Sequence, residues 1–192
     1  MPSFLLLHGI SSRRPPEHWQ FWLAAVLAAD GHQVLYPGLP FPDTPSFDEW
    51  DAALADQLEV LGADGEERVV ICHSLSCLLW LKSASTSAGD PSLVVDRLLL
   101  VSPPESSRVP EDGASFRLSD LDATAVRRSA TKIRIVCSDN DPFNPVGGDK
   151  LYGEPLGVET TVITGAGHIT PSTGYGPWPD LAAWCAEPER RM

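Results

Sequence analysis

The segment Val69-Val70-Ile71-Cys72-His73-Ser74-Leu75-Ser76 joins the strongest strand signal in the chain directly to a helix. Its β-branched residues follow the charged run 66–68, which is typical of a buried strand, and the apolar run 78–81 continues as a buried helix. No glycine or proline separates the two elements, so the chain must turn sharply at Ser74. Such a turn places the side chain of its central residue above the end of the sheet. Ser74 is therefore the candidate nucleophile.

A serine hydroxyl is a poor nucleophile at neutral pH unless a base accepts its proton and a carboxylate orients that base. Asp141 lies in an acidic turn after the apolar run 133–137, and His168 lies in a glycine-rich turn after the run 160–164. Each residue thus follows a predicted strand, as Ser74 does. The chain order Ser, Asp, His is that of the α/β-hydrolase triad. We interpret the three residues together as a catalytic triad.

The acidic turn offers two candidate carboxylates, Asp139 and Asp141. Asp141 precedes Pro142, which favours an extended backbone that reaches outwards to the loop of His168. Asp139 directly follows the strand and is expected to brace the turn through its own backbone. We therefore assign the triad acid to Asp141.

The rest of the chain alternates between predicted strands and helices. Strands are expected at residues 4–8, 33–36, 69–72, 98–101, 133–137 and 160–164. The first helix is expected to begin at 17 and to end before Gly31, and the second to begin at a capping box of Ser46 and Glu49 and to end at about 61. Further helices are expected from 74 to about 87–91, over 146–152, and from starting points at 119 and 179. This alternation predicts an α/β fold with about six strands, mainly parallel, and helices on both faces. We expect one domain over residues 1–192.

Length, charge and cysteine content limit the possible functions. A chain of 192 residues can bury about 70% of its unfolded surface around one core. Its net charge of −12 argues against nucleic acid or an anionic membrane as partner. The first residues lack a signal peptide pattern, so a cytoplasmic location is the default expectation. The four cysteines have no metal-type spacing and are interpreted as reduced core thiols.

Several motifs resemble the small serine hydrolases related to YdeN and retinoblastoma-binding protein 9. They are Leu7-His8-Gly9, Glu17-His18-Trp19-Gln20, Cys72-His73-Ser74-Leu75, Ser138-Asp139-Asn140-Asp141-Pro142, Gly167-His168-Ile169 and Gly174-Tyr175-Gly176-Pro177-Trp178-Pro179. The resemblance covers nearly the whole chain and implies an α/β-hydrolase fold without a large lid. It also implies a triad at Ser74, Asp141 and His168. The nucleophile turn departs from the usual pattern, because Cys72 and Ser76 stand where such turns often have glycine.

The remaining candidates have structural interpretations. We expect His8 and His73 to brace the loops beside the site through hydrogen bonds. His18 and Trp19 are expected at a helix start and in the core, although both could touch the pocket rim. Trp178 could line the pocket or pack the last helix, and the sequence leaves both possibilities open. Ser102 also ends a strand, but Pro103 and Pro104 prevent the immediate helix that a nucleophile turn requires.

The sequence therefore predicts a serine hydrolase that cleaves a small ester, thioester or amide through an acyl-enzyme on Ser74. The backbone N–H groups of Ile10 and Leu75 are the expected oxyanion donors. No metal and no organic cofactor is required, and the expected partner is a small-molecule substrate. The alternative is a weak or inactive hydrolase scaffold that binds an unknown protein partner.

Overall fold

The computed structural model describes residues 1–62, 65–87 and 90–190. Its centre is one sheet of six strands in the order β2-β1-β3-β4-β5-β6, and every neighbouring pair is parallel. The strands span Ser3–Leu7 (β1), Gln33–Leu35 (β2), Arg68–His73 (β3), Val95–Val101 (β4), Ala130–Ser138 (β5) and Glu159–Ile163 (β6). The predicted parallel α/β sheet is confirmed.

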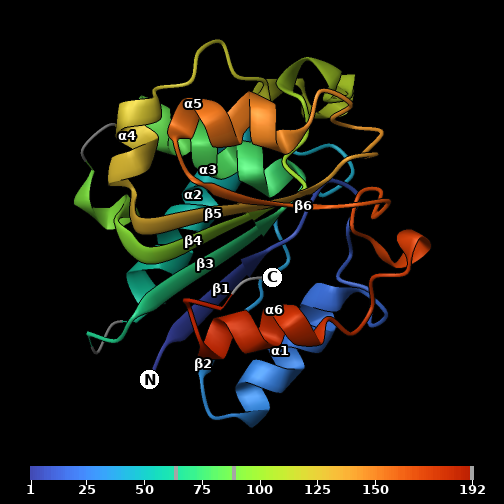
Figure 1. Cartoon of the computed structure of the whole chain (residues 1–192). Coiled ribbons are helices and arrows are strands. Elements are labelled where there is room, and N and C mark those ends of the chain that lie inside the picture. The colour runs from blue at the N-terminus through green and yellow to red at the C-terminus, as the bar shows by residue number, and fades with distance from the viewer. Residues whose placement is uncertain (63–64, 88–89, 191–192) are drawn as a thin grey trace.

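Helices cover both faces of this sheet (Figure 1). Helices α1 and α6 lie on one face, and α2, α3, α4 and α5 lie on the other. The helices span Trp19–Ala29 (α1), Phe47–Val60 (α2), Leu75–Thr86 (α3), Ala123–Arg128 (α4), Glu154–Leu156 (α5) and Pro179–Ala186 (α6). Shorter turns are the 3-10 segments Pro91–Leu93 (η1), Ser106–Arg108 (η2), Glu111–Phe116 (η3) and Pro171–Thr173 (η5), and the π-helix Asp149–Gly153 (η4).

Apolar side chains fill both sides of the sheet because its strands are covered on both faces. In β1, Leu5 and Leu7 point into the core under α2 and α3, whereas Phe4 and Leu6 point into the core under α1 and α6. The same alternation continues through β3 and β4. This arrangement explains why the strands are continuous apolar runs in the sequence. It also places β3, and the residue that follows it, in the middle of the sheet.

Two predicted helices start at other residues than expected. Helix α4 begins at Ala123 instead of Ser119, because the carboxylate of Asp122 accepts the N–H groups of Thr124 and Ala125 at 2.9 Å each. The helix expected over 146–152 is a π-helix over 149–153 that continues into α5. Gly147 has a φ of +102°, which a right-handed helix cannot include, so the helix starts after it.

The capping box at α2 was also wrong. Ser46 occupies the N-cap position, but its side chain makes no capping hydrogen bond. Instead Ser115 Oγ, from the distant segment η3, accepts the N–H of Phe47 at 3.0 Å. Elsewhere, Gly31 follows α1 with a φ of +86°, as the sequence predicted. Helix α3 ends at Thr86, and residues 88–89 of its expected end lie outside the described residues.

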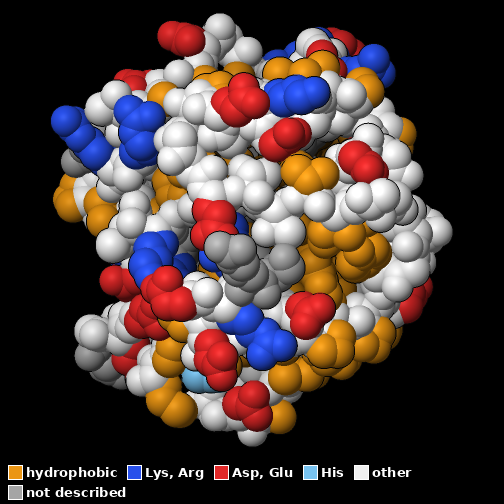
Figure 2. Space-filling model, in the orientation of Figure 1, with side chains coloured by type: hydrophobic (Ala, Val, Ile, Leu, Met, Phe, Trp, Pro, Cys, Tyr) orange, Lys and Arg blue, Asp and Glu red, His pale blue; other side chains and the backbone are white. Residues whose placement is uncertain are grey.

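Charged residues are dispersed over the face of the molecule that Figure 2 shows. Asp and Glu side chains on the face in Figure 2 alternate with Lys and Arg and do not gather in one patch. All four cysteines are buried. Within residues 1–62, 65–87 and 90–190, no helix has the length and apolar character needed to cross a bilayer.

The cap of α2 yields a first prediction. Ser46→Ala should change the free energy of unfolding by less than about 0.5 kcal/mol, whereas Ser115→Ala should lower it by about 1 kcal/mol. The reason is that Ser115, not Ser46, provides the side-chain acceptor at this helix start. Urea denaturation of the two variants measures the difference. A larger loss for Ser46→Ala would contradict this account of the cap.

Candidate active site

Ser74 is the turning point between β3 and α3. Its φ of 58° and ψ of −122° are strained for a residue with a side chain. The N–H of Ser74 donates to the carbonyl of Val101 in β4 at 3.0 Å, which fixes the turn to the neighbouring strand. Although Ser74 occupies the N-cap position of α3, its hydroxyl makes no capping bond. The hydroxyl is therefore available to another partner.

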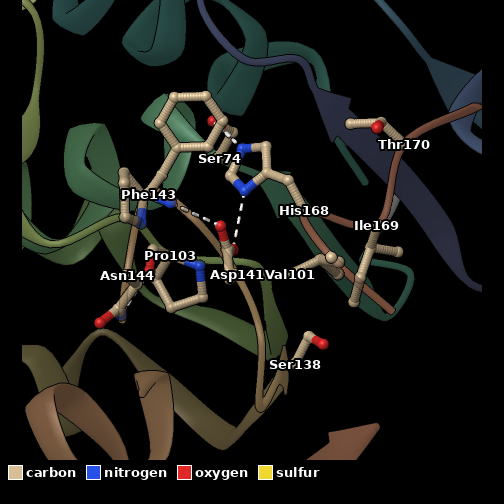
Figure 3. Close-up of polar contacts among 12 residues, drawn as sticks. Ser74, Val101, Pro103, Ser138, Asp141, Phe143, Asn144, His168, Ile169 and Thr170 are labelled. Carbon is tan, nitrogen blue, oxygen red and sulfur yellow. Dashed lines mark hydrogen bonds and ion pairs between the residues drawn. The ribbon is translucent and has the colours of Figure 1, made fainter. Parts of the chain in front are cut away.

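That partner is His168, and Asp141 follows it in a continuous chain of hydrogen bonds (Figure 3). Ser74 Oγ lies 2.8 Å from His168 Nε2, and His168 Nδ1 lies 2.8 Å from Asp141 Oδ2. Nδ1 must carry the proton for the carboxylate to accept it, which leaves Nε2 as the acceptor for the serine proton. The other carboxylate oxygen accepts the N–H of Phe143 at 2.9 Å. Asp141 is only 2% exposed, so the carboxylate is held in this orientation.

The residues beside Ser74 fit the sharp turn. Ser76 Oγ accepts the N–H of His73 at 2.9 Å and lies 2.8 Å from the carbonyl oxygen of Leu7, to which it can donate. Gly9 allows the loop after β1 to approach Ser74, because a Cβ at residue 9 would lie 2.8 Å from the Cβ of Ser74. The turn at Ser74 and the loop after β1 are therefore in direct contact.

Two backbone N–H groups are available beside Ser74. Ile10 follows Gly9, and Leu75 is the first residue of α3. Among the described residues, neither N–H donates a hydrogen bond to another protein group. Leu75 lies at the positive end of the helix dipole, where negative charge is favoured. An oxygen atom bound above Ser74 could accept hydrogen bonds at this position.

A cavity of about 440 Å³ opens over Ser74 and His168. Most of its wall is apolar and comes from loops at the carboxyl edge of the sheet. The wall residues include Ile10, Pro15, Leu75, Pro104, Val109, Pro110, Phe143 and Pro171. The ring of Phe143 lies beside the imidazole of His168, with 4.6 Å between ring centroids (Figure 3). In the part of the chain that the structure describes, no group of three metal-ligating side chains occurs.

The other histidines near the site have structural contacts, as the sequence predicted. His8 contacts the Gly9 carbonyl through Nδ1 at 2.8 Å and accepts the N–H of Leu39 through Nε2 at 2.9 Å. His73 Nε2 lies 3.1 Å from the carbonyl oxygen of His168, to which it can donate. Burial lowers the pKa of His8, lowers that of His73 well below its usual value, and lowers that of His18 to about 4. The imidazoles of His8, His18 and His73 are therefore uncharged at neutral pH, and the ring of His73 lies beside that of His168, with 5.2 Å between centroids.

The contacts of four further residues show which of their expected roles they have. His18 begins α1, where its Nδ1 accepts the N–H of Gln20 at 3.2 Å, and it also lines the cavity. Trp19 is fully buried. Trp178 packs edge-on against Trp19 with 5.6 Å between centroids and does not line the cavity, so it belongs to the core under α6. Ser102 is buried at the end of β4 and does not line the cavity either.

Asp139 makes a different contact from the one expected, and two features of the cavity were not predicted from the sequence. Asp139 Oδ1 accepts the N–H of Gly165 in the loop of His168, at 2.8 Å, instead of bracing its own turn. Phe143 beside the imidazole was not anticipated, although its position two residues after Asp141 offered a signal. The wall formed by Val109 and Pro110 comes from residues 102–119, a stretch without a clear helical or strand pattern.

Comparisons with known proteins agree with this fold. The YdeN gene product of B. subtilis is 19% identical over 97% of each chain, with a TM-score of 0.78. A YdeN-like hydrolase from Pectobacterium atrosepticum is 21% identical over 97% of this chain and 90% of its own, with a TM-score of 0.73. An esterase domain from a Rhodothermus marinus protein is 15% identical over 96% and 86%, with a TM-score of 0.64. No curated protein sequence matches the chain.

These structures define the class of the protein, which has an α/β-hydrolase fold. The profile of the serine hydrolase family matches residues 4–187. The chain therefore belongs to the serine hydrolase family and is a hydrolase, and the resemblance to YdeN-related proteins is confirmed.

The buried histidines predict a loss of stability in mild acid. Each is less easily protonated in the folded chain than in the unfolded chain, whose histidines titrate near about pH 6.5. As the pH falls below that value, the unfolded state gains protons that the folded state does not. The free energy of unfolding should therefore fall by up to about 1.4 kcal/mol per pH unit for each histidine. For His18 this loss should continue until the pH reaches its folded-state pKa of about 4.

Urea denaturation at about pH 7.5 and about pH 5.5 measures this loss. His18→Asn provides a matched control, because asparagine keeps an N-cap acceptor for α1 and does not titrate. The variant should lose less stability than the natural protein between the two pH values. An identical loss would contradict a contribution from His18.

Proposed function

We propose that the protein hydrolyses small carboxylic esters, thioesters or amides through an acyl-enzyme on Ser74. The observation that carries this proposal is the unbroken chain of hydrogen bonds from Ser74 Oγ through His168 to Asp141, each link 2.8 Å long, at the floor of a cavity. In this proposal Ser74 is the nucleophile, His168 the base and Asp141 the acid that orients the imidazole.

The first half of the reaction forms the acyl-enzyme. Ser74 Oγ attacks the substrate carbonyl carbon while its proton passes to His168 Nε2. Asp141 stabilises the imidazolium through Nδ1–H. The tetrahedral intermediate then collapses: the bond to the leaving group breaks, and the leaving oxygen, sulfur or nitrogen takes the proton from Nε2. The acyl group remains on Ser74 as an ester.

The second half releases the acid. Water enters the place of the leaving group and gives a proton to His168 Nε2 as its oxygen attacks the acyl carbon. When the second tetrahedral intermediate collapses, Oγ takes the proton back and the carboxylic acid leaves. In both halves the N–H groups of Ile10 and Leu75 would donate to the carbonyl oxygen as it gains negative charge. Their lack of other acceptors among the described residues supports this role.

An ester is the substrate that we favour for the first assays. The Rhodothermus marinus structure, which shares the fold, is described as an esterase domain. The mainly apolar cavity wall suits an uncharged acyl group.

The alternative of an inactive scaffold depended on Cys72 and Ser76 at the nucleophile turn. Cys72 is fully buried in the core under α3, and the Ser76 hydroxyl has partners in the turn itself. Neither residue displaces Ser74 Oγ from His168 Nε2. We therefore keep the enzyme as the proposal, and no observation favours the scaffold.

Labelling by a fluorophosphonate probe tests the proposal, because only an activated serine reacts. Ser74→Ala should abolish labelling and lower the hydrolysis of short activated esters by at least about 10³-fold, and His168→Ala should be nearly as damaging. Ser102→Ala is the control, since Ser102 also ends a strand with a positive φ of 49°. Labelling that persists in Ser74→Ala would move the nucleophile elsewhere, and an unlabelled natural protein would favour the scaffold.

The two aspartates of the acidic turn should differ in effect. Asp141→Asn would present an amide N–H₂ group to His168 Nδ1, which favours the wrong imidazole tautomer and should lower kcat by about 10⁴-fold. Asp139→Asn keeps an oxygen acceptor for Gly165 and should change kcat by less than about 5-fold. Steady-state kinetics of both variants test the assignment, and equal losses would refute it.

Side-chain packing in the cavity wall predicts a preference for short acyl chains. Ile10, Leu75 and Val109 pack around Gly113, where an added Cβ would lie within 3.0–3.6 Å of all three side chains. The value of kcat/KM should therefore fall from four-carbon to twelve-carbon p-nitrophenyl esters. Val109→Ala should move the optimum to longer chains by about two carbons, because it removes two methyl groups from this wall. Rates that rise steadily with chain length would contradict this limit on acyl length.

A further inference from the structure

The loop that carries His168 has little support from the sheet. It follows β6, which is an edge strand and pairs only with β5. Gly165, Gly167 and Ile169 have positive φ values of 71°, 57° and 50°. For a β-branched residue such as Ile169 this conformation is costly. Contacts outside the sheet must therefore hold the loop in place.

The acidic turn after β5 supplies those contacts, one side chain for each residue of the loop. Asp139 Oδ1 accepts the N–H of Gly165 at 2.8 Å. Ser138 Oγ accepts the N–H of Ala166 at 2.9 Å. Asn140 Oδ1 accepts the N–H of Gly167 at 2.7 Å. The fourth residue of the turn, Asp141, then binds the imidazole of His168 itself.

These contacts form one connected group. Ser138 Oγ lies 2.7 Å from Asn140 Oδ1 and 3.0 Å from the Ile163 carbonyl oxygen, so its proton can be donated to either. Ser138 is buried at the end of β5, whereas Asp139 and Asn140 are exposed. Exposed hydrogen bonds contribute little to global stability, because water replaces them in the unfolded chain. Their specific consequence is the position of the loop relative to the turn.

We propose that Ser138, Asp139 and Asn140 are positioning residues that hold the loop 165–167 so that His168 Nε2 stays within hydrogen-bonding distance of Ser74 Oγ. We call these three residues the loop clamp. The clamp acts through His168 and does not line the cavity. This inference rests on the proposed function of the triad. A displacement of about 1 Å in a catalytic group can lower the rate about 100-fold.

Removal of single acceptors tests the clamp. Asn140→Ala and Asp139→Ala each delete one bond to the loop, and each should lower kcat and the rate of fluorophosphonate labelling by about 10- to 100-fold, with KM changed less than about 2-fold. Asn140→Asp and Asp139→Asn keep an oxygen acceptor and should recover kcat to within about 5-fold of the natural protein.

Asp120→Ala is the matched control. Asp120 Oδ1 also accepts a backbone N–H, that of Leu121 at 2.9 Å, from an exposed carboxylate outside the cavity wall. The control should keep the natural kcat, and all variants should keep melting temperatures within a few degrees of it. If the alanine variants of the clamp lose no more activity than Asp120→Ala, or if melting temperature falls in step with kcat, the proposal is overturned.

A spectroscopic measurement separates failure of the clamp from failure of the proposed function. The Nδ1 proton of His168, bound to Asp141, should give a protected downfield resonance in ¹H NMR that Asp141→Asn removes. Asn140→Ala and Asp139→Ala should broaden or shift that resonance, whereas Asp120→Ala should leave it unchanged. This readout does not require turnover. An unchanged resonance in both clamp variants overturns the clamp, while a natural protein that shows the resonance but hydrolyses no ester overturns only the proposed function.

Discussion

The hydrogen bond between Ser74 Oγ and His168 Nε2 joins residues that follow strands three places apart in the sheet. Since neighbouring strands lie about 4.8 Å apart, the loop after β6 must return over β5 and β4 by about 14 Å to reach the end of β3. Asp141, which follows β5, lies between them and contacts His168 on the way. The geometry of the site thus depends on how this loop crosses the sheet edge.

The uncharged imidazole of His73 braces the loop of His168 where it crosses the end of the sheet. His73 Nε2 lies 3.1 Å from the carbonyl oxygen of His168, and burial holds the pKa of His73 well below its usual value. A neutral ring can donate one proton to that carbonyl without placing a second charge beside His168. Desolvation, which is unfavourable for a charged group, here favours the neutral form of the bracing histidines. Only His168 among them contacts both Ser74 and a carboxylate.

The sequence predicted features that depend on neighbours along the chain and missed those set by distant contacts. Apolar runs such as 98–101 identify strands because both faces of the sheet are covered. The strand-to-helix turn identified Ser74 for a similar local reason. By contrast, the acceptor for Phe47 N–H comes from Ser115, 68 residues away, and Asp139 binds a loop 26 residues further on. Neither partner has a periodic or motif signal, so only the folded chain reveals it.

The unusual residue at position 76 shows how a steric requirement can be met elsewhere. A glycine two residues after a nucleophile relieves crowding in the turn, yet Ser76 is fully buried here and hydrogen-bonded to His73 N–H. The close approach instead falls on Gly9, whose missing side chain leaves room for Ser74. Because Ser76 Oγ also contacts the Leu7 carbonyl, it ties the nucleophile turn to the strand that leads to Gly9 and Ile10. The hydroxyl at residue 76 therefore couples the position of Ser74, the proposed nucleophile, to that of the N–H group proposed to bind the oxyanion, which a glycine could not do.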